Sequence, residues 1–522
     1  MPLPRHELLL RSMMEVGIYR RHREHGQALI YGLFLLITGL VGLFFLFNTG
    51  QLASEKTRLV NTADAVAYSA AVLHARALNF DAYNNRALIA NEVLIAQLVS
   101  VSSWAQYAKQ HVDNIPAVFP ECMVPNGAGA VAGAVNNYGA DYAAMCYLIA
   151  QPELPVREAI DALGVIVPQV SAAAVTAIEL NKSAIKAAQE FLHTDLVFKQ
   201  NRQTLLQNVA DRNYVGAGSV TVVSGGLTGG GAGTGLVDDW SGFTQKYSGD
   251  ERTRLGEVTA IAAEKSEFLN KRTWESKSTF PVGNVWCLGH RNLVTRAGGT
   301  NLIGLDEWKA EDTESFWSWH PHGFLKHCRK KETPIAWGEQ RAFPEGSEQD
   351  ASNAWLGNSR TVNPTAHSFA SSAEWTNYSG LPAYYDLSTA RLTDSTDPRL
   401  VFSVKVVRNA NATATSSGTS GIRPSDRLNH FPSPLAGGVM SAISTGEVYF
   451  ERPWFNEGNY SYTTGDMAYI VIQNQSVPTG ADVPKMRELG SLFNPYWQVH
   501  LTSNPAASVT AQQTAQGGAK MP

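Results

Sequence analysis

The amino-acid sequence predicts an α+β fold. An N-terminal transmembrane helix continues into a long periplasmic helix, a helical hairpin region follows, and a β-rich C-terminal domain completes the chain. Three observations predict this order. An uncharged apolar segment lies near the N-terminus, a long segment without glycine or proline follows it, and short alternating apolar runs dominate from about residue 280 onward.

The composition limits the class of protein. The chain has 522 residues, of which 44% are hydrophobic, so it is expected to hold two or three folded units and is not disordered throughout. A formal net charge of -4 and an isoelectric point near 6.4 argue against a nucleic-acid binder, which normally has a basic face. Charged residues make up 17%, below the usual ~25%, which favours a chain that lies partly outside the cytosol.

The strongest local signal is the uncharged apolar segment Leu29–Phe47. A helix needs about 20 apolar residues to cross a bilayer core of ~30 Å, so residues 26–50 are predicted to form a transmembrane helix. A buried core helix is one alternative, but it would normally carry a polar stripe. A cleaved secretory signal is the other, yet the apolar run is too long for one and residues 48–51 offer no clear cleavage site.

Basic residues flank the predicted span unequally, and this asymmetry predicts its orientation. Residues 1–25 form a basic cytoplasmic leader, so the bulk of the chain is translocated. We expect a single-pass protein of a bacterial inner membrane, with its C-terminal bulk in the periplasm or outside the cell. The basic residues before the span are Arg11, Arg20, Arg21 and Arg23, and those just after it are Lys56 and Arg58.

Residues 51–215 are predicted to form a long helix and a helical hairpin. Neither glycine nor proline occurs within Gln51–Ile115, and apolar residues recur there at spacings of three, four and seven. One helix would extend roughly 95 Å beyond the membrane, and a kinked helical bundle is the alternative. A second helical region, about Pro155–Asn213 with an interruption at Pro168, is expected to fold back on the first, whose Ala/Leu face it would cover.

The composition changes beyond the hairpin. Residues 216–237 are predicted to be a glycine-rich loop, residues 238–279 a helical connector, and residues 280–504 a β-rich periplasmic domain. Residues 505–522 form a polar tail that is expected to be disordered. The clearest strand signals are the alternating runs at residues 402–406 and 497–501 and the continuous apolar run Met467–Ile472.

All four cysteines follow the predicted span: Cys122, Cys146, Cys287 and Cys328. The predicted compartment is oxidising, so an even number of cysteines favours two disulfides. Pairing by neighbourhood gives Cys122–Cys146 and Cys287–Cys328, each contributing about 3–4 kcal/mol, but three connectivities are possible.

A zinc site is the alternative for the second cysteine pair. Thiols and imidazoles at short spacing are zinc ligands, but this spacing fits no common finger or ribbon. Neighbouring tryptophans favour an aromatic core with a disulfide, so no metal is expected. The residues concerned are Cys287, His290, His320, His322, His327 and Cys328.

Recognised catalytic motifs are absent from the sequence. The glycine-rich run at residues 225–235 contains neither G-x-G-x-x-G nor a Lys-Ser/Thr pair, so it is not a phosphate loop. Asp386 and Ser388 begin like the D-x-S-x-S metal site of adhesion modules, but Ala390 lacks the last hydroxyl and a strand-edge turn is expected. We therefore expect neither an enzyme nor a bound cofactor.

The segment Gly26–Ala71 resembles the N-terminal module of TadG-like (TadE/G-like) proteins of the Flp, or tight-adherence, pilus. The resemblance implies a bacterial inner-membrane protein with a large periplasmic part, involved in assembling or anchoring a pilus. The family pattern follows an uncharged span, and its core here is Asn61, Ala63, Asp64 and Ala65. The other matching residues are Gly50, Leu52, Lys56, Leu59, Ala67 and Ala70.

Pilin-like processing is a separate possibility raised by Gly26 and Gln27, which follow a basic leader and precede the apolar helix. A prepilin peptidase cuts after such a glycine, and true pilins usually carry Glu at the fifth mature position. That position is Tyr31 here, so an uncleaved anchor is the preferred interpretation.

These observations predict a non-enzymatic structural or assembly component of a Flp/Tad-type pilus. Its expected partners are the inner membrane and other pilus-assembly or pilin subunits, with no nucleic acid, and it could oligomerise through its long helix. The alternative is a minor pilin, cleaved after Gly26 and built into the fibre or tip as an adhesive head. A membrane-tethered periplasmic enzyme is a third reading that no motif supports.

Overall fold

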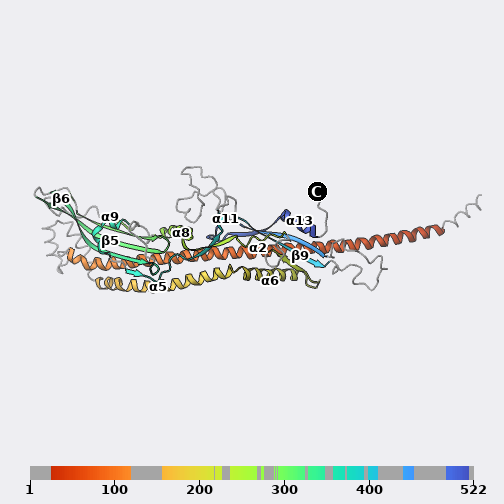
Figure 1. The fold of residues 1–522 in the computed structure, drawn as a ribbon, viewed down its shortest axis with the longest axis horizontal. Helices are drawn as coiled ribbons and strands as arrows, with labels where there is room; N and C mark the ends of the chain where they lie inside the picture. Colours follow the sequence, from red (N-terminus) through yellow and green to blue (C-terminus); the bar gives the residue numbers. More distant parts are fainter. Residues whose placement is uncertain are drawn as a thin grey trace, which may run out of the picture.

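The protein was examined as a computed structural model, in which the described residues form an elongated body along one long helix (Figure 1). The predicted α+β class is confirmed: a long apolar helix, further helices and then a β-rich region. The structure describes residues 25–118, 156–216, 218–225, 235–266, 272–275, 287, 290, 292–323, 327–346, 357–370, 373–392, 398–409, 439–451 and 490–515.

Helix α2, His25–Val118, is one uninterrupted α-helix of 94 residues. The predicted long helix is therefore confirmed, and the kinked bundle is wrong. Because no proline or glycine lies within Gln51–Ile115, no backbone hydrogen bond is lost and no residue weakens the helix there. At 1.5 Å per residue, α2 is about 140 Å long.

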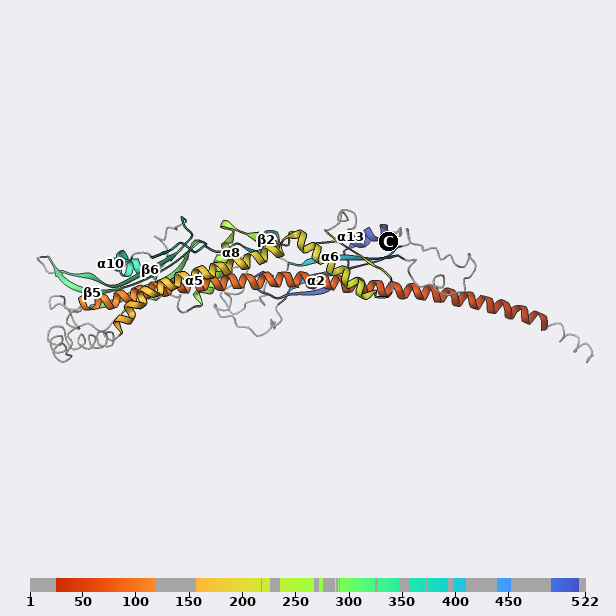
Figure 2. The same ribbon diagram turned by 90° about the horizontal axis from the view of Figure 1, so that it is seen from below.

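Two helices run back along α2 in the antiparallel direction (Figure 2). The expected fold-back is thus present: the start of α5 lies beside the end of α2, where Gly164 meets Lys109, and the end of α6 lies near Arg58. The two helices are α5, Arg157–Leu192, and α6, Asp195–Asn213.

The predicted interruption at Pro168 is wrong. Pro168 lies inside α5, and the helix breaks instead at His193 and Thr194. Proline removes one backbone hydrogen bond, but contacts with α2 hold the helix on both sides of it. Gly164 is buried so close to α2 that an added Cβ would stand 2.5 Å from the Cβ of Lys109, and Ser171 is buried on the same side.

Three sheets accompany the helices in the described part of the chain. The first has the order β1-β9-β10-β11 and is antiparallel, the second has the order β3-β4-β5-β6-β7 with only β6 and β7 parallel, and the third pairs β2 with β8. The strands are β1 Thr221–Ser224, β2 Thr244–Tyr247, β3 Trp274–Glu275, β4 Leu293–Ile303, β5 Glu307–His322, β6 His327–Ala342, β7 Ala373–Trp375, β8 Tyr384–Leu387, β9 Leu400–Asn409, β10 Val439–Phe450 and β11 Trp497–Thr502.

Short helices connect these strands. The described ones are η2 Gly249–Arg252, α8 Thr253–Glu264, α9 Ser359–Val362, α10 Pro364–Phe369, α11 Thr389–Leu392 and α13 Ala506–Ala515. Helix α13 corrects the prediction that the whole tail is disordered. Its Ser508 is buried and donates a hydrogen bond to the carbonyl of Gly235, so the tail is packed on the body.

The predicted boundaries around residue 280 are also corrected. Strand β1 lies within residues 216–237, where only a loop was expected, and pairs with β9; β2 lies within the expected helical connector and pairs with β8. The strand predictions at residues 402–406 and 497–501 are confirmed by β9 and β11. Met467–Ile472, Cys122 and Cys146 lie outside the described residues.

The principal core forms where the alanine face of α2 meets the first sheet. The expectation that the second helical region packs on this face agrees with α6, and β9 and β10 of the first sheet share the face with it. Small side chains allow a close approach: a Cβ added to Gly446 of β10 would stand 2.7 Å from the Ala67 carbonyl oxygen and 2.9 Å from the Ala71 Cβ.

Replacement of Gly446 by alanine tests this close approach. The added methyl would overpack the helix–sheet contact, and we expect the free energy of unfolding to fall by about 1–3 kcal/mol. The control is Gly50→Ala, since a Cβ there meets nothing within 4 Å and alanine favours the helix. Chemical denaturation of both variants provides the measurement, and equal stability of Gly446→Ala and the wild type would contradict the packing.

Candidate functional site

The N-terminal part of α2 has an exposed apolar end, followed by a segment that packs closely on the body. Side chains from Ala28 to Phe47 are mostly exposed, and this window is long and apolar enough to cross a membrane. Thr38 donates its hydroxyl to the carbonyl of Phe34 at 2.8 Å, so its polar group is satisfied within the helix, as lipid requires. Figure 1 shows this end of α2 projecting alone from the body.

The body begins to hold α2 immediately beyond the apolar end. The Glu55 carboxylate pairs with Arg408 of β9 at 2.7 Å. The Arg58 guanidinium lies 4.5 Å from the ring centroid of Tyr214, beyond the end of α6. Burial, followed by the nearby Glu55 carboxylate, raises the pKa of the Tyr214 hydroxyl. Glu55 and Arg58 therefore both fix α2 to the body.

The residues of the family pattern divide between two faces of α2. Ala63 is fully buried in the core, whereas Asn61 is exposed and Asp64 and Ala65 are half-buried. Within the described part of the chain, neither Asn61 nor Asp64 makes a side-chain hydrogen bond or ion pair. The alanine thus has a packing role, and the two polar residues are available to a partner.

A buried polar cluster follows where α6 crosses α2. The Arg202 guanidinium lies 3.0 Å from His74 Nε2 and pairs with Asp238 at 2.6 Å. The imidazole of His74 also stacks on Trp240, with ring centroids 5.2 Å apart. Burial, followed by the positive charge of Arg202, lowers the pKa of His74 well below its usual value.

Asp81 and Asn85 lie about two and three helical turns beyond His74, and they contact α5, β8 and the segment that precedes β11. Asp81 pairs with His193 at 2.7 Å, and burial raises the pKa of its carboxyl against the opposing effect of that contact. Asn85 donates to the carbonyls of Tyr385 and Leu492, each at 2.7 Å. One side chain of α2 therefore joins segments that are about a hundred residues apart.

Glu92 forms the central buried contact between α2 and α5. Lys182 Nζ lies 2.6 Å from its carboxylate, and Tyr378 and Trp308 donate to the same group at 2.7 and 3.2 Å. Burial raises the pKa of Glu92, and the Lys182 charge opposes the shift. Because both partners are almost completely buried, removal of either would leave an uncompensated charge.

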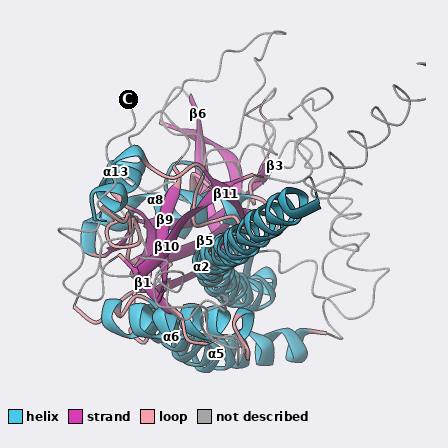
Figure 3. Ribbon diagram, turned by 90° about the vertical axis from the view of Figure 1, so that its right-hand side faces the viewer, coloured by secondary structure: helices cyan, strands magenta, loops and turns pink. Residues whose placement is uncertain are grey.

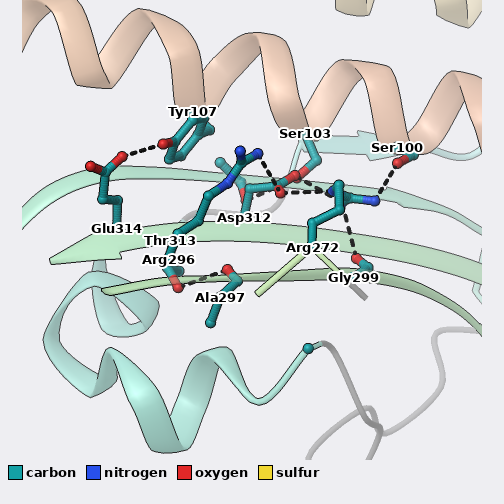
Figure 4. Close-up of polar contacts among 12 residues, drawn as sticks. Ser100, Ser103, Tyr107, Arg272, Arg296, Ala297, Gly299, Asp312, Thr313 and Glu314 are labelled. Atoms are coloured by element: carbon teal, nitrogen blue, oxygen red, sulfur yellow. Dashed lines mark hydrogen bonds and ion pairs between the residues drawn. The ribbon is translucent and has the colours of Figure 1, made fainter. Parts of the chain in front are cut away.

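Buried polar contacts also join the distal end of α2 to β5 (Figure 4). Ser103 donates to Asp312 at 2.9 Å, and Tyr107 donates to Glu314. Arg272 donates to both Asp312 oxygens and, at 2.7 Å, to the hydroxyl of Ser100. These contacts fix the rotation of α2 relative to the second sheet.

Sequence reasoning missed the buried polar residues of α2, although their spacing carries a signal. His74, Asp81, Asn85 and Glu92 follow one another at intervals of seven, four and seven, which places them on one helical face. Polar residues in an otherwise alanine- and leucine-rich face indicate buried partners. Each of them contacts groups of the same chain, so their arrangement locks the helix in place rather than exposing a reactive group.

The metal-site alternatives are not supported by the described residues. Cys287 and Cys328 form a disulfide, so their sulfurs are not thiolate ligands. His290 stacks on Trp319 with centroids 4.0 Å apart, and no group of three or more potential ligands is arranged for a metal in the described ranges. Asp386 lies within strand β8, where it is buried and pairs with Arg254 at 2.7 Å.

The pH dependence of stability tests the buried state of His74. The unfolded chain binds a proton at this imidazole near pH 6.5, whereas the folded chain keeps it neutral, so stability falls as the pH drops below that value. We expect the wild type to lose up to about 1.4 kcal/mol per pH unit more than His74→Gln, measured by denaturant unfolding from pH 7.5 to 5. The control His290→Gln should follow the wild type, and parallel curves for wild type and His74→Gln would refute the assignment.

Comparison with known proteins identifies only the membrane-proximal part. No curated protein and no solved structure matches the chain. Residues 26–73 match the family model described as "Putative Flp pilus-assembly TadE/G-like". This match covers the exposed apolar helix, the clamp at Glu55 and Arg58, and the two-faced family pattern. The N-terminal module of this chain, residues 26–73, is therefore similar to the TadE/G-like family of Flp pilus-assembly proteins.

Proposed function

We propose that this protein is a non-enzymatic assembly component of a bacterial Flp/Tad-type pilus, anchored in the inner membrane and carrying its body in the periplasm. The observation that carries the proposal is the continuity of α2 from its exposed apolar end into the core of the body. A helix of this kind joins the membrane and the distal end of the body without a hinge.

The contacts of α2 support a rigid stalk. The clamp at Glu55, the buried pair at Glu92 and the serine and tyrosine contacts at β5 lie at successive heights along the helix. Each resists rotation or sliding of α2 relative to the sheets. The membrane helix and the distal end of the body are therefore expected to move as one unit, which suits a part that positions other subunits above the membrane.

The outward polar pair of the family pattern supplies a contact for such subunits. Asn61 and Asp64 lie about four helical turns beyond the apolar segment, outside the fully buried alanine face of α2. Neighbouring Tyr68 is 47% exposed and extends this face. A polar pair beside an exposed tyrosine is a typical composition for a protein–protein contact.

The minor-pilin alternative depends on cleavage between Gly26 and Gln27. Helix α2 begins at His25, so both residues are helical and the helix beyond them would survive cleavage. The mass of the mature N-terminus distinguishes the two functions: an intact leader supports the anchor, and a chain that begins at Gln27 supports the pilin.

A topology reporter tests the placement of the body. Alkaline phosphatase fused after Pro522, so that the whole chain is retained, should be active because the basic leader holds the N-terminus in the cytoplasm. Green fluorescent protein at the same position should be dark when exported through the general secretory route. The opposite pair of readings would place the body in the cytoplasm and end the proposal.

Charge reversal at the outward pair tests the role in piliation. The double variant Asn61→Lys, Asp64→Lys should abolish surface pili in a deletion strain, while its free energy of unfolding stays within about 0.5 kcal/mol of the wild type. The matched control is Asp250→Lys at an exposed site in η2, which should restore pili. Normal piliation by the double variant would remove these residues from the assembly contact, and normal piliation by the deletion strain would exclude the function itself.

A further inference from the structure

Helix α5 presents two faces that repeat every seven residues. The inner face is buried against the rest of the body and consists of Gly164, Ser171, Val175, Ile178, Lys182 and Gln189. The other face is defined here as the outer seam. Its ten residues follow one another at alternating spacings of four and three: Ala159, Leu163, Ile166, Val170, Ala173, Ala177, Leu180, Ala184, Ala187 and Phe191.

Every residue of the outer seam is apolar and every one is exposed in the described structure. The exposed fractions of the large side chains are high, at 74% for Leu180, 67% for Phe191 and 64% for Val170. Single exposed apolar residues are ordinary, but an unbroken line of them marks an interaction surface. A spacing that averages 3.5 residues over more than four heptads is the pattern of a coiled coil.

The inner face holds α5 rigidly, so the outer seam is a preformed surface. Lys182 pairs with Glu92 at 2.6 Å, and Gln189 donates to Asn85 at 3.0 Å. Near the other end of α5, Gly164 contacts Lys109. Figure 3 shows α5 and α6 along one margin of the body.

We propose that the outer seam packs in parallel against the outer seam of a second copy of this chain. The direction rests on the proposed function, because a shared membrane gives both anchored copies the same orientation. In a symmetric parallel pair each seam residue meets its own copy, so the apolar line is self-complementary. Residues 159–191 supply a contact about 48 Å long.

The residues that flank the seam favour a second copy over a different partner. Flanking charges normally select the partner of a coiled coil, and identical charges repel in a self-pair. Only one of the ten flanking residues, Glu190, is charged. The ten are Ile160, Ala162, Val167, Gln169, Ala174, Thr176, Asn181, Ser183, Ala188 and Glu190.

The same composition disfavours a lipid surface as the occupant. Helices that lie on membranes carry Lys and Arg beside their apolar face, and the flanking positions here have none. The four alanines at residues 173, 177, 184 and 187 instead favour close approach of another helix, toward the short end of the usual ~8–10 Å interaxial range.

Cysteine crosslinking of the full-length protein in native membranes tests the proposal. Ala187→Cys places a thiol in the seam near one end of α5, so it meets its own copy only in a parallel pair. The matched control Val165→Cys lies on the same helix, is 49% exposed and faces away from the seam. Mild oxidation should give a disulfide-linked dimer from Ala187→Cys, above the level of both the control and the wild type. No excess over Val165→Cys would overturn the parallel pairing.

A charge in the seam gives an independent readout. Leu180→Lys would place two like charges face to face, and the dissociation constant of the detergent-solubilised dimer should rise about tenfold or more. The matched control Val165→Lys should leave it unchanged, and both variants should unfold like the wild type, since neither side chain is buried.

Other outcomes decide against the proposal. A linked species whose mass fits one copy plus a different protein would assign the seam to that protein. A monomer that binds anionic vesicles through α5 would assign it to lipid. The proposed anchoring is judged separately by fractionation: a wild type absent from the membrane fraction would refute the anchor, while the solubilised chain still reports whether the seams pair.

Discussion

The body of this protein is organised by the need to cover one very long helix. An α-helix of 94 residues cannot bury its own apolar and polar groups, because its side chains all point away from its axis. Beyond the exposed apolar segment, α5 and α6 cover one side of α2 and the sheets cover another (Figure 3). The fold is therefore better described as helices and sheets packed around α2 than as separate helical and β domains.

Two kinds of contact hold α2 against the surrounding helices and sheets. Toward the exposed apolar end of α2, beyond the ion pair of Glu55, the contact is close and apolar, as where Gly446 meets Ala67 and Ala71. Farther out, buried polar groups dominate, among them His74, Asp81 and Glu92. Apolar burial stabilises the contact but does not depend on how the groups are oriented. A buried ion pair or hydrogen bond forms only when its two groups are aligned, so it also fixes the position of the helix. The combination yields a helix that is both firmly held and fixed in rotation.

Much of this architecture could be predicted from the sequence because helix formation depends largely on residues that are close together in the chain. The absence of glycine and proline predicted α2, and alternation predicted β9 and β11. The interruption at Pro168 was wrong, because tertiary contacts around Gly164 and Ser171 outweigh one missing hydrogen bond.

Sheet membership could not be predicted in the same way. The short strands β1 and β2 acquire their conformation by pairing with β9 and β8, far along the chain. No local pattern carries that information. The candidate site was predictable to a similar extent: the family pattern located Asn61 and Asp64, but the partners of His74 and Glu92 lie more than 80 residues away, beyond what spacing can reveal.

The pairing of Asn79 with Trp497 has a consequence for biogenesis. The Asn79 side chain donates to the Trp497 carbonyl and accepts from its amide, both at 3.0 Å, across 418 residues of sequence. If export proceeds from the N-terminus, α2 emerges first and the strand that covers it emerges last. For that interval the alanine face and its buried polar groups are open to water and to other nascent chains. A protein with so many distant contacts folds slowly, and the adhesive surface of α2 stays open until the last strand has paired.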